Sequence, residues 1–171
     1  MHIDFVAERQ HEALIDLMHE LCSASSAGAP VARDDVRSNL LENLVAPQSP
    51  VRLAVAADDD GTLAGFAAIC VVHSLVDPDP RRRGQLLLKE LYVRQGRQGQ
   101  GVGRALVAWV ARHALERGCA RMDWHVSVSN RPALAFYRAL NAQHVAGRLS
   151  YRLGGESLAR LAGVPRGDAA A

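Results

Sequence analysis

The segment from Leu91 to Val110, LYVRQGRQGQGVGRALVAWV, restricts the possible folds more than any other part of this chain. An apolar run ends at Val93, and glycine then occupies every second position from Gly99 to Gly103. Apolar residues at helical spacing follow from Leu106 to Ala114, which predicts a helix that ends at Gly118. The segment therefore predicts a strand, a glycine-rich turn and a helix in direct succession.

A second strand is predicted after this helix. Residues 85–93, QLLLKELYV, are nearly apolar on both faces, as in a strand inside a sheet. Residues 120–128, ARMDWHVSV, have a strand pattern as well. Two strands joined by a helical crossover run parallel in one sheet. We therefore expect the strand at 85–93 to be central and the strand at 120–128 to lie parallel to it.

The rest of the chain alternates between strand and helix patterns. In chain order these are a strand at 2–6, helices at 8–22 and from about 34 to 46, strands at 51–57 and 63–75, a polar loop at 74–84, a helix at 130–140, and one or two strands within 142–153. The predicted fold class is α/β (or α+β), a single domain with a mixed sheet and helices on both faces. We expect this domain to span residues 1–153 and residues 154–171 to form a loose tail.

Composition narrows the classes of function. A net charge of +2 is too small to indicate nucleic-acid binding. No apolar run has the length of a membrane helix, and acids in the first ten residues argue against a signal peptide. Cys22, Cys70 and Cys119 are far apart, which suits thiols in a reducing cytoplasm and neither disulfides nor a zinc site. We therefore expect a cytoplasmic protein without a bound metal.

The glycines from Gly99 to Gly103 have a chemical interpretation. Without Cβ atoms, successive backbone amides can converge on an anion, and the helix that follows adds free amides and a positive dipole end. Arg97 and Arg104 flank the turn and could pair with phosphate oxygens. The alternative is a tight turn that binds nothing. The spacing matches neither a P-loop nor a GxGxxG dinucleotide motif, but the glycines and arginines together favour a phosphate cradle.

Two motifs resemble the GCN5-related N-acetyltransferase (GNAT) family. The stretch QGQGVG at residues 98–103 is similar to the acetyl-CoA-binding core of that family, Q/R-x-x-G-x-G/A. NRPALAFYRALNA, from Asn130, is similar to its NxxAxxFYxxxGF motif. The resemblance covers about residues 51–153. Asn141 replaces the usual glycine, which asparagine can do because it tolerates left-handed backbone, and Gln95 stands where proline is common.

The resemblance implies a mixed sheet that splays at its parallel pair of strands, with the pantetheine arm of acetyl-CoA in the splay. Backbone groups of the strand end would bond the pantetheine, and amides of the glycine turn would bind the pyrophosphate. Asn130 would contact the cofactor and would also cap a helix. The implied cofactor-binding residues are Leu91, Tyr92, Val93, Gln98, Gly99, Gln100, Gly101, Val102, Gly103, Arg104 and Asn130.

Acetyl transfer from a thioester needs a neutral amine and a proton for the departing thiolate. The resemblance places Tyr137 beside the sulfur as general acid; the alternative is a tyrosine packed on the sheet. Glu90 interrupts an apolar strand, where a carboxylate needs a partner or a function. We expect it to be the general base, through water, although a strand-edge acid paired with arginine is an alternative. His125 is a weaker candidate base.

The resemblance implies an acceptor groove formed by the first two helices and the loops near residues 24–35 and 74–84. Four loop acids could attract a cationic amine or be turn residues. They are Asp34, Asp35, Asp77 and Asp79. The expected function is direct acetyl transfer to a primary amine of a small molecule in a ternary complex, by an enzyme that forms homodimers through C-terminal strands. Alternatives are a protein N-terminus, an aminoacyl-tRNA (supported only by the RRR run at 81–83), and a non-catalytic acyl-CoA-binding regulatory module.

Overall fold

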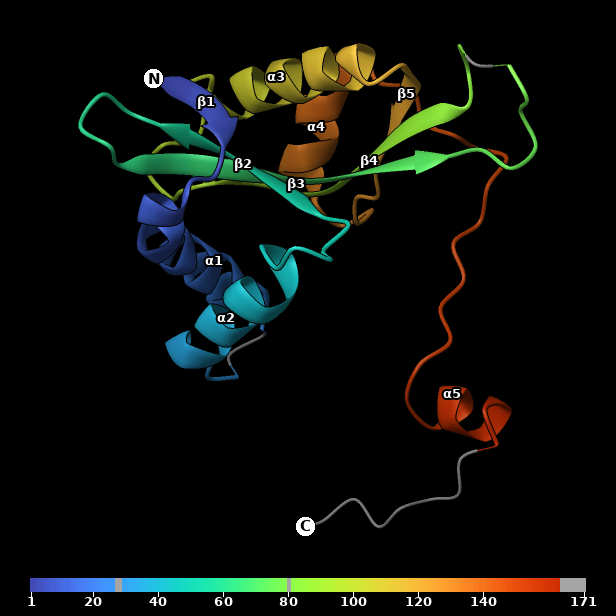
Figure 1. The fold of residues 1–171 in the computed structure, drawn as a ribbon, viewed down its shortest axis with the longest axis horizontal. Coiled ribbons are helices and arrows are strands. Elements are labelled where there is room, and N and C mark those ends of the chain that lie inside the picture. Colours follow the sequence, from blue (N-terminus) through green and yellow to red (C-terminus); the bar gives the residue numbers. More distant parts are fainter. Residues whose placement is uncertain (27–28, 80, 164–171) are drawn as a thin grey trace. The chain divides into compact units, whose positions relative to one another are not determined.

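The computed structural model describes residues 1–26, 29–79 and 81–163 (Figure 1). The chain divides into a larger compact unit, Met1–His125, and a C-terminal unit that begins at Val126. The larger unit contains the whole sheet and the glycine-rich turn, and the C-terminal unit contains the second sequence motif.

Five strands of the larger unit form one sheet in the order β1-β2-β3-β4-β5. Their bounds are β1 His2–Phe5, β2 Arg52–Ala57, β3 Leu63–His73, β4 Gly84–Val93 and β5 Cys119–Asp123. The first four strands pair antiparallel to their neighbours, and β5 pairs parallel to β4. Helix α3, Val102–Glu116, is the crossover between these last two strands. The predicted parallel unit and mixed sheet are therefore confirmed, with β4 flanked by a strand on each side.

Helices cover both faces of this sheet, as predicted (Figure 1). On one face lie a short 3₁₀ turn at Glu8–Gln10, α1 at His11–Ser25, and α2 at Arg33–Asn39, which continues as a π-helical turn at Leu40–Leu44. On the other face lies α3. Each face has its own apolar core. The first core includes Leu14, Leu17, Leu40 and Phe66, and the second includes Ala67, Leu86, Leu106 and Val110.

One glycine allows α3 and β4 to approach β3 closely. A Cβ atom added at Gly65 would lie 2.6 Å from the carbonyl oxygen of Tyr92 and 3.2 Å from Cδ1 of Leu106. The first of these neighbours is backbone, which cannot move away without distorting the sheet. Gly65 therefore helps to place the end of β4 and the first turns of α3, the two elements that flank the glycine-rich turn.

A β-bulge in β4 changes which residues face each side of the sheet. Ile69 pairs with Leu88 and Ala68 pairs with Glu90, so Lys89 is an extra residue without a partner in β3. Leu88 packs in the core beneath α3, whereas Ala68 packs in the core of α1 and α2. Directly paired residues share a face, so the bulge turns Glu90 toward the face that α1 and α2 cover.

The parallel strands β4 and β5 part after four paired positions. Their pairing runs from Gly84↔Cys119 to Leu87↔Asp123, and β4 then continues alone on that edge to Val93. This matches the predicted splay. The strand expected at 120–128 ends at Asp123, so that prediction was too long at its end, and His125 lies beyond the strand. The alternating sequence pattern continues past Asp123. Strand β5 nevertheless ends there, because Asp123 is its last residue paired with β4.

The C-terminal unit contains α4 at Arg131–Ala139 and α5 at Gly155–Leu161. Asn130 caps α4, because its Oδ1 accepts a hydrogen bond from the Ala133 amide at 3.1 Å. Asn141 has a φ of 58°, which confirms the expected left-handed residue after this helix. The strands expected within 142–153 are absent, because this segment has no strand beside it among the described residues. Of the expected tail, residues 155–161 are helical and residues 164–171 lie outside the described residues.

Cys22, Cys70 and Cys119 are free thiols, and Cys119 is buried. Within the described ranges, no cluster of three histidine, cysteine or acidic side chains could hold a metal ion. None of the helices described in this structure combines the length and the apolar character that a membrane crossing requires.

Candidate cofactor site and catalytic residues

The turn between β4 and α3, residues 94–101, contains three glycines with left-handed backbone conformations. The φ angles of Gly96, Gly99 and Gly101 are 79°, 76° and 85°. A Cβ atom at any of these positions would meet no atom within 4 Å, so the glycines serve the backbone conformation and not close packing. The sequence pattern had missed Gly96, which is the third residue of a β-turn closed by the Arg97 amide and the Arg94 carbonyl at 3.0 Å. Gly103, by contrast, lies inside α3.

The backbone amides from Gln98 to Arg104 form a cluster of unused donors. Helix α3 begins after Gly101, and its first closing hydrogen bond runs from the Ala105 amide to the Gly101 carbonyl at 2.9 Å. In the part of the chain that the structure describes, none of the amides at 98–104 donates to another protein group. Such amides at a helix N-terminus attract anions, and the helix dipole adds to this attraction.

Two glutamine side chains stabilise the turn from within. Nε2 of Gln98 donates to the Val93 carbonyl at 3.2 Å, and Nε2 of Gln100 donates to the Gly96 carbonyl at 2.9 Å. These bonds satisfy carbonyl groups of the turn with side-chain donors. The backbone amides of both glutamines are thereby left available. The sequence had indicated the glutamines only as parts of a motif, because side-chain bonds inside a turn have no periodic signature.

The two flanking arginines differ in their surroundings. Nη1 and Nη2 of Arg97 contact the two carboxylate oxygens of Asp58 at 2.5 and 3.0 Å. The guanidinium of Arg97 is therefore engaged, and the expectation that it would pair with phosphate is not supported. Arg104 lies exposed in the first turn of α3 and pairs with no acid among the described residues. Arg104 remains the cation available to an anion at the amide cluster.

The end of β4 presents a free backbone edge. From Leu88 to Val93 no strand pairs with β4 on the side of β5 among the described residues. Leu91 and Val93 pack against the core of α3, and Tyr92 packs against the core of α1 and α2. The Tyr92 hydroxyl donates a hydrogen bond to Oε1 of Glu20 at 2.6 Å. Burial of the phenol and, to a smaller extent, its contact with the Glu20 carboxylate raise the pKa of Tyr92 well above its ordinary value. The backbone groups of Leu91 and Val93 are therefore available for the predicted cofactor contacts, whereas those of Tyr92 face β3, as do those of Arg94, whose amide donates to the Ala64 carbonyl.

Glu90 lies on this strand, just past the bulge. The side chain of Glu90 is exposed as a whole, but neighbouring atoms partly desolvate its carboxyl, which raises the pKa above the ordinary glutamate value, while a hydrogen bond from the Leu91 amide opposes this change. Among the described residues Glu90 forms no ion pair, so the alternative of a strand-edge acid paired with arginine is not observed. Its place at the splay and its raised pKa both suit a general base.

Tyr137 and Asn130 belong to the C-terminal unit. Tyr137 is half-buried in α4, and its ring contacts that of Phe136 edge-on at a centroid distance of 5.1 Å. The capping bond from the Ala133 amide accounts for Asn130 as a structural residue. Because Glu90 belongs to the larger unit, the pairing of Tyr137 and Glu90 as acid and base stays a prediction, and so does the cofactor contact of Asn130.

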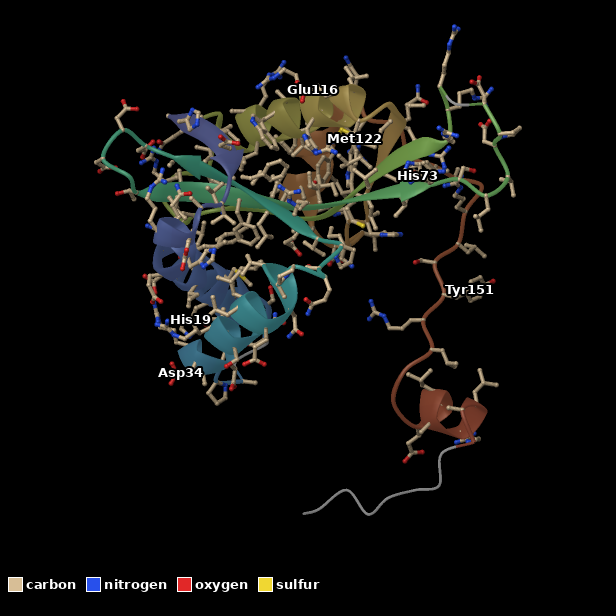
Figure 2. The ribbon with its side chains drawn as sticks, viewed as in Figure 1. His19, Asp34, His73, Glu116, Met122 and Tyr151 are labelled. Atoms are coloured by element: carbon tan, nitrogen blue, oxygen red, sulfur yellow. The ribbon has the colours of Figure 1, made fainter. Side chains whose placement is uncertain are left out.

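The loop acids divide into two groups. Asp77 and Asp79 are turn residues: Asp77 pairs with Arg82 at 3.2 Å, and Asp79 accepts a hydrogen bond from the Arg81 amide at 2.9 Å. Asp34 and its neighbour Asp35 are exposed in the first turn of α2, and Asp34 lies at the outer end of the helical pair, away from the sheet (Figure 2). Residues 27, 28 and 80, which belong to the expected acceptor loops, lie outside the described residues.

Comparisons with known proteins agree with this architecture. Residues 14–142 match the model of the acetyltransferase (GNAT) family. The chain is 35% identical over 81 residues to thialysine N-epsilon-acetyltransferase of Bos taurus, covering 46% of this chain and 48% of that protein. It is 34% identical over 106 residues to aminoglycoside N(6')-acetyltransferase type 1 of Stenotrophomonas maltophilia, covering 62% of this chain and 67% of that protein. This chain thus spans about half the length of the thialysine acetyltransferase.

A solved structure is similar over nearly the whole chain. It is an integron cassette protein from the mobile metagenome of V. cholerae, with a TM-score of 0.82 and 26% sequence identity. The match covers 94% of this chain and 96% of that protein. The overall fold is therefore shared with a protein of nearly equal extent.

Proposed function

The chain belongs to the acetyltransferase (GNAT) family, and we propose on this premise that it transfers an acetyl group from acetyl-CoA to a primary amine of a small molecule. Transfer is direct, within a ternary complex of enzyme, acetyl-CoA and amine. The observation that carries the proposal is the cluster of unused amides at 98–104, which stands directly beside the free edge of β4. A cofactor with a pyrophosphate and a peptide-like arm needs these two features together.

Acetyl-CoA, the acyl donor of this family, binds through both features. Its pantetheine arm contains amide groups, which pair with the free edge at Leu91 to Val93 as an added strand would. The pyrophosphate accepts hydrogen bonds from the amides of Gln98 to Arg104 and lies at the positive end of α3. The guanidinium of Arg104 supplies a charge-assisted contact, and Asn130 supplies a further contact from α4.

The chemical step begins with removal of a proton from the amine. A free amine with a pKa of about 10 is mostly protonated at neutral pH, so a base is required. Glu90 takes this proton through a water molecule. The neutral nitrogen then attacks the thioester carbonyl carbon, and the carbon–sulfur bond breaks. The attacking nitrogen loses its second proton to water, and Tyr137 donates its proton to the departing thiolate and regains one from water, so the products are an N-acetylated amine and CoA.

The pH dependence of the reaction tests the role of Glu90. A general base acts in its ionised form, so kcat/KM should fall as the pH drops through the pKa of Glu90. Because partial desolvation raises this pKa, the decline should begin at a higher pH than an ordinary glutamate would give. In Glu90→Gln we expect lower activity without this acidic decline. Glu42→Gln, at an exposed position after α2, is the matched control and should keep the wild-type profile.

The proposed acceptor class follows from the relatives. Their names state acetylation of thialysine and of an aminoglycoside amine, which are small amines. A panel of small primary amines, with a peptide amine and an aminoacyl-tRNA as further arms, would be tested for thiol release from acetyl-CoA. Release with a small amine alone supports the proposal, and release with either other arm identifies the alternative acceptor. Binding of acetyl-CoA without thiol release from any arm would identify a non-catalytic acyl-CoA-binding module.

We also propose that two copies associate through the segment after α4. Leu149, Tyr151 and Leu153 alternate along this segment, and the first two are 80% and 89% exposed. An exposed apolar row with the period of a strand is a surface that a second copy would cover. Sedimentation equilibrium should therefore give the mass of a dimer. Tyr151→Lys should shift the protein toward a monomer, and a wild-type monomer would contradict this part of the proposal.

We place the catalytic domain at residues 1–153 and treat residues 154–171 as dispensable for turnover. The family match ends at residue 142, within this domain. A cytoplasmic location is supported by the three free cysteines, which a reducing compartment keeps as thiols. Retention of turnover after removal of residues 154–171 would support the boundary, and loss of turnover in a folded truncation would move it.

A further inference from the structure

Glu20 belongs to helix α1 and contacts the turn at residues 94–101, which lies far from α1 in the sequence. It lies near the end of α1, and its Oε1 accepts hydrogen bonds from the Tyr92 hydroxyl at 2.6 Å and from the Gln95 backbone amide at 2.7 Å. Its Oε2 lies 3.7 Å from Nε of Arg94. A single carboxylate thus holds the last part of β4 and the first residues of the turn.

Partial burial strengthens these contacts. The side chains of Glu20 and Arg94 are 28% and 30% exposed, so solvent and salt screen their attraction less than that of a surface pair. Hydrogen bonds to an ionised carboxylate are also shorter and stronger than neutral ones. The raised pKa of Tyr92 agrees with a phenol that donates to this carboxylate in a buried setting.

Asp58, which belongs to another part of the chain, also contacts this turn through Arg97. It follows β2, and its backbone amide donates to the Thr62 carbonyl at 2.9 Å, which ties it to the β2–β3 hairpin. Both of its carboxylate oxygens contact the guanidinium of Arg97. The Nε atoms of Arg97 and Arg94 are buried and have no hydrogen-bond partner among the described residues. The guanidinium of Arg97 is thus committed to Asp58, whereas that of Arg94 lies within ion-pair distance of Glu20 without a hydrogen bond to it.

The turn needs such external contacts because of its composition. Gly96, Gly99 and Gly101 have more backbone freedom than other residues, and fixing one residue costs about 1–2 kcal/mol of conformational entropy. If the turn were ordered only when the cofactor binds, this cost would reduce the affinity. A turn that is already held in place presents its amides to the pyrophosphate without that cost.

We propose that Glu20 and Asp58 are positioning residues that preorganise the amide cluster at 98–104 for the pyrophosphate of the cofactor. This inference rests on the proposed function. Neither carboxylate is itself a ligand of the anion, which it would repel. Glu20 acts through the Gln95 amide and Arg94, and Asp58 acts through Arg97. The two residues make acetyl-CoA affinity depend on α1 and on the β2–β3 hairpin.

The test compares CoA binding by calorimetry in wild type, Glu20→Ala, Asp58→Ala and Asp16→Ala. Asp16 is the matched control, because it lies one turn before Glu20 on α1 and its carboxylate pairs with Arg33 at 2.7 Å, not with the turn. We expect the Kd for CoA to rise about tenfold or more in Glu20→Ala and in Asp58→Ala, as for loss of a charge-assisted hydrogen bond. The control should stay within about twofold of wild type.

Hydrogen exchange separates positioning from a general loss of stability. In the two test variants without ligand, exchange of the amides at 94–104 should accelerate while the core strands keep their protection. Glu20→Gln retains an oxygen that can accept from Gln95, so it should recover part of the affinity lost in Glu20→Ala. In kinetics, KM for acetyl-CoA should rise with little change in kcat.

Two results would overturn the inference. One is a Kd for CoA within about twofold of wild type in both alanine variants. The other is faster exchange throughout the larger unit with no excess at 94–104, which would assign Glu20 and Asp58 to general stability. Failure of the proposed function is a separate result, since wild-type protein would then bind no CoA. The milder Glu20→Gln variant keeps the test available if an alanine variant does not fold.

Discussion

Replacing Tyr137 by phenylalanine is expected to lower kcat by about 10²- to 10⁴-fold, the usual contribution of a general acid. The variant lacks the phenolic proton that the departing thiolate needs, but it keeps the ring that contacts Phe136 in α4. Packing should therefore change little. Steady-state kinetics with a reactive amine would measure kcat, and calorimetry would measure the Kd for acetyl-CoA, which should stay close to that of wild type.

Tyr151→Phe is the matched control for this prediction. This variant also removes a phenolic hydroxyl, but from a tyrosine that is 89% exposed on the segment after α4, so kcat should be unchanged. If Tyr137→Phe also retains kcat within about twofold, Tyr137 has no role in proton transfer. The half-buried tyrosine would then be a packing residue of α4, and the thiolate would have to obtain its proton from water.

Replacing Gly101 by valine is expected to raise the Kd for acetyl-CoA by at least about tenfold, which corresponds to 1.4 kcal/mol. Gly101 has a φ of 85°, and a left-handed conformation costs a residue with a Cβ atom about 1–2 kcal/mol, more if it is β-branched. The backbone would relieve this strain by rotating, and the amides of Gly101 and Val102 would rotate with it. Calorimetric titration with acetyl-CoA measures the effect.

Gly118→Val is the control at the other end of α3. Gly118 also has a left-handed φ, 70°, and a Cβ atom there would meet no atom within 4 Å. The two variants should therefore lose similar amounts of stability in thermal unfolding, while only Gly101→Val loses affinity. Equal affinity in both variants would mean that the amide cluster does not bind the cofactor, and the proposed function would lose its main support.

Much of the fold could be predicted from local patterns. The parallel arrangement of β4 and β5 follows from a strand, a helix and a strand in succession, because a helical crossover forces that direction. Helices on both faces follow from the amphipathic patterns of α1, α2 and α3. The hairpin between β2 and β3 follows from the Asp60-Gly61 turn, where Gly61 has a φ of 85°.

Predictions that depended on pairing were less accurate. Leu149, Tyr151 and Leu153 have the alternation of a strand, yet the segment is not a strand, because alternation describes side chains and a strand also requires a neighbour for its backbone. The end of β5 was predicted too late for the same reason. The bulge at Lys89, which decides the face on which Glu90 lies, has no sequence signal of its own.

The sequence by itself indicated a glycine-rich turn followed by a helix start, because both are local features of the backbone, and the proposal of an anion site rests on them. It also determined the family, through two motifs that need no tertiary information. Only the tertiary structure decided what holds the turn and which charges remain free. Asp58 and Glu20 lie 39 and 75 positions from the residues that they contact, and their contacts commit Arg97 and leave Arg104 available. Electrostatic attraction depends on distance in space, and folding alone brings these groups together.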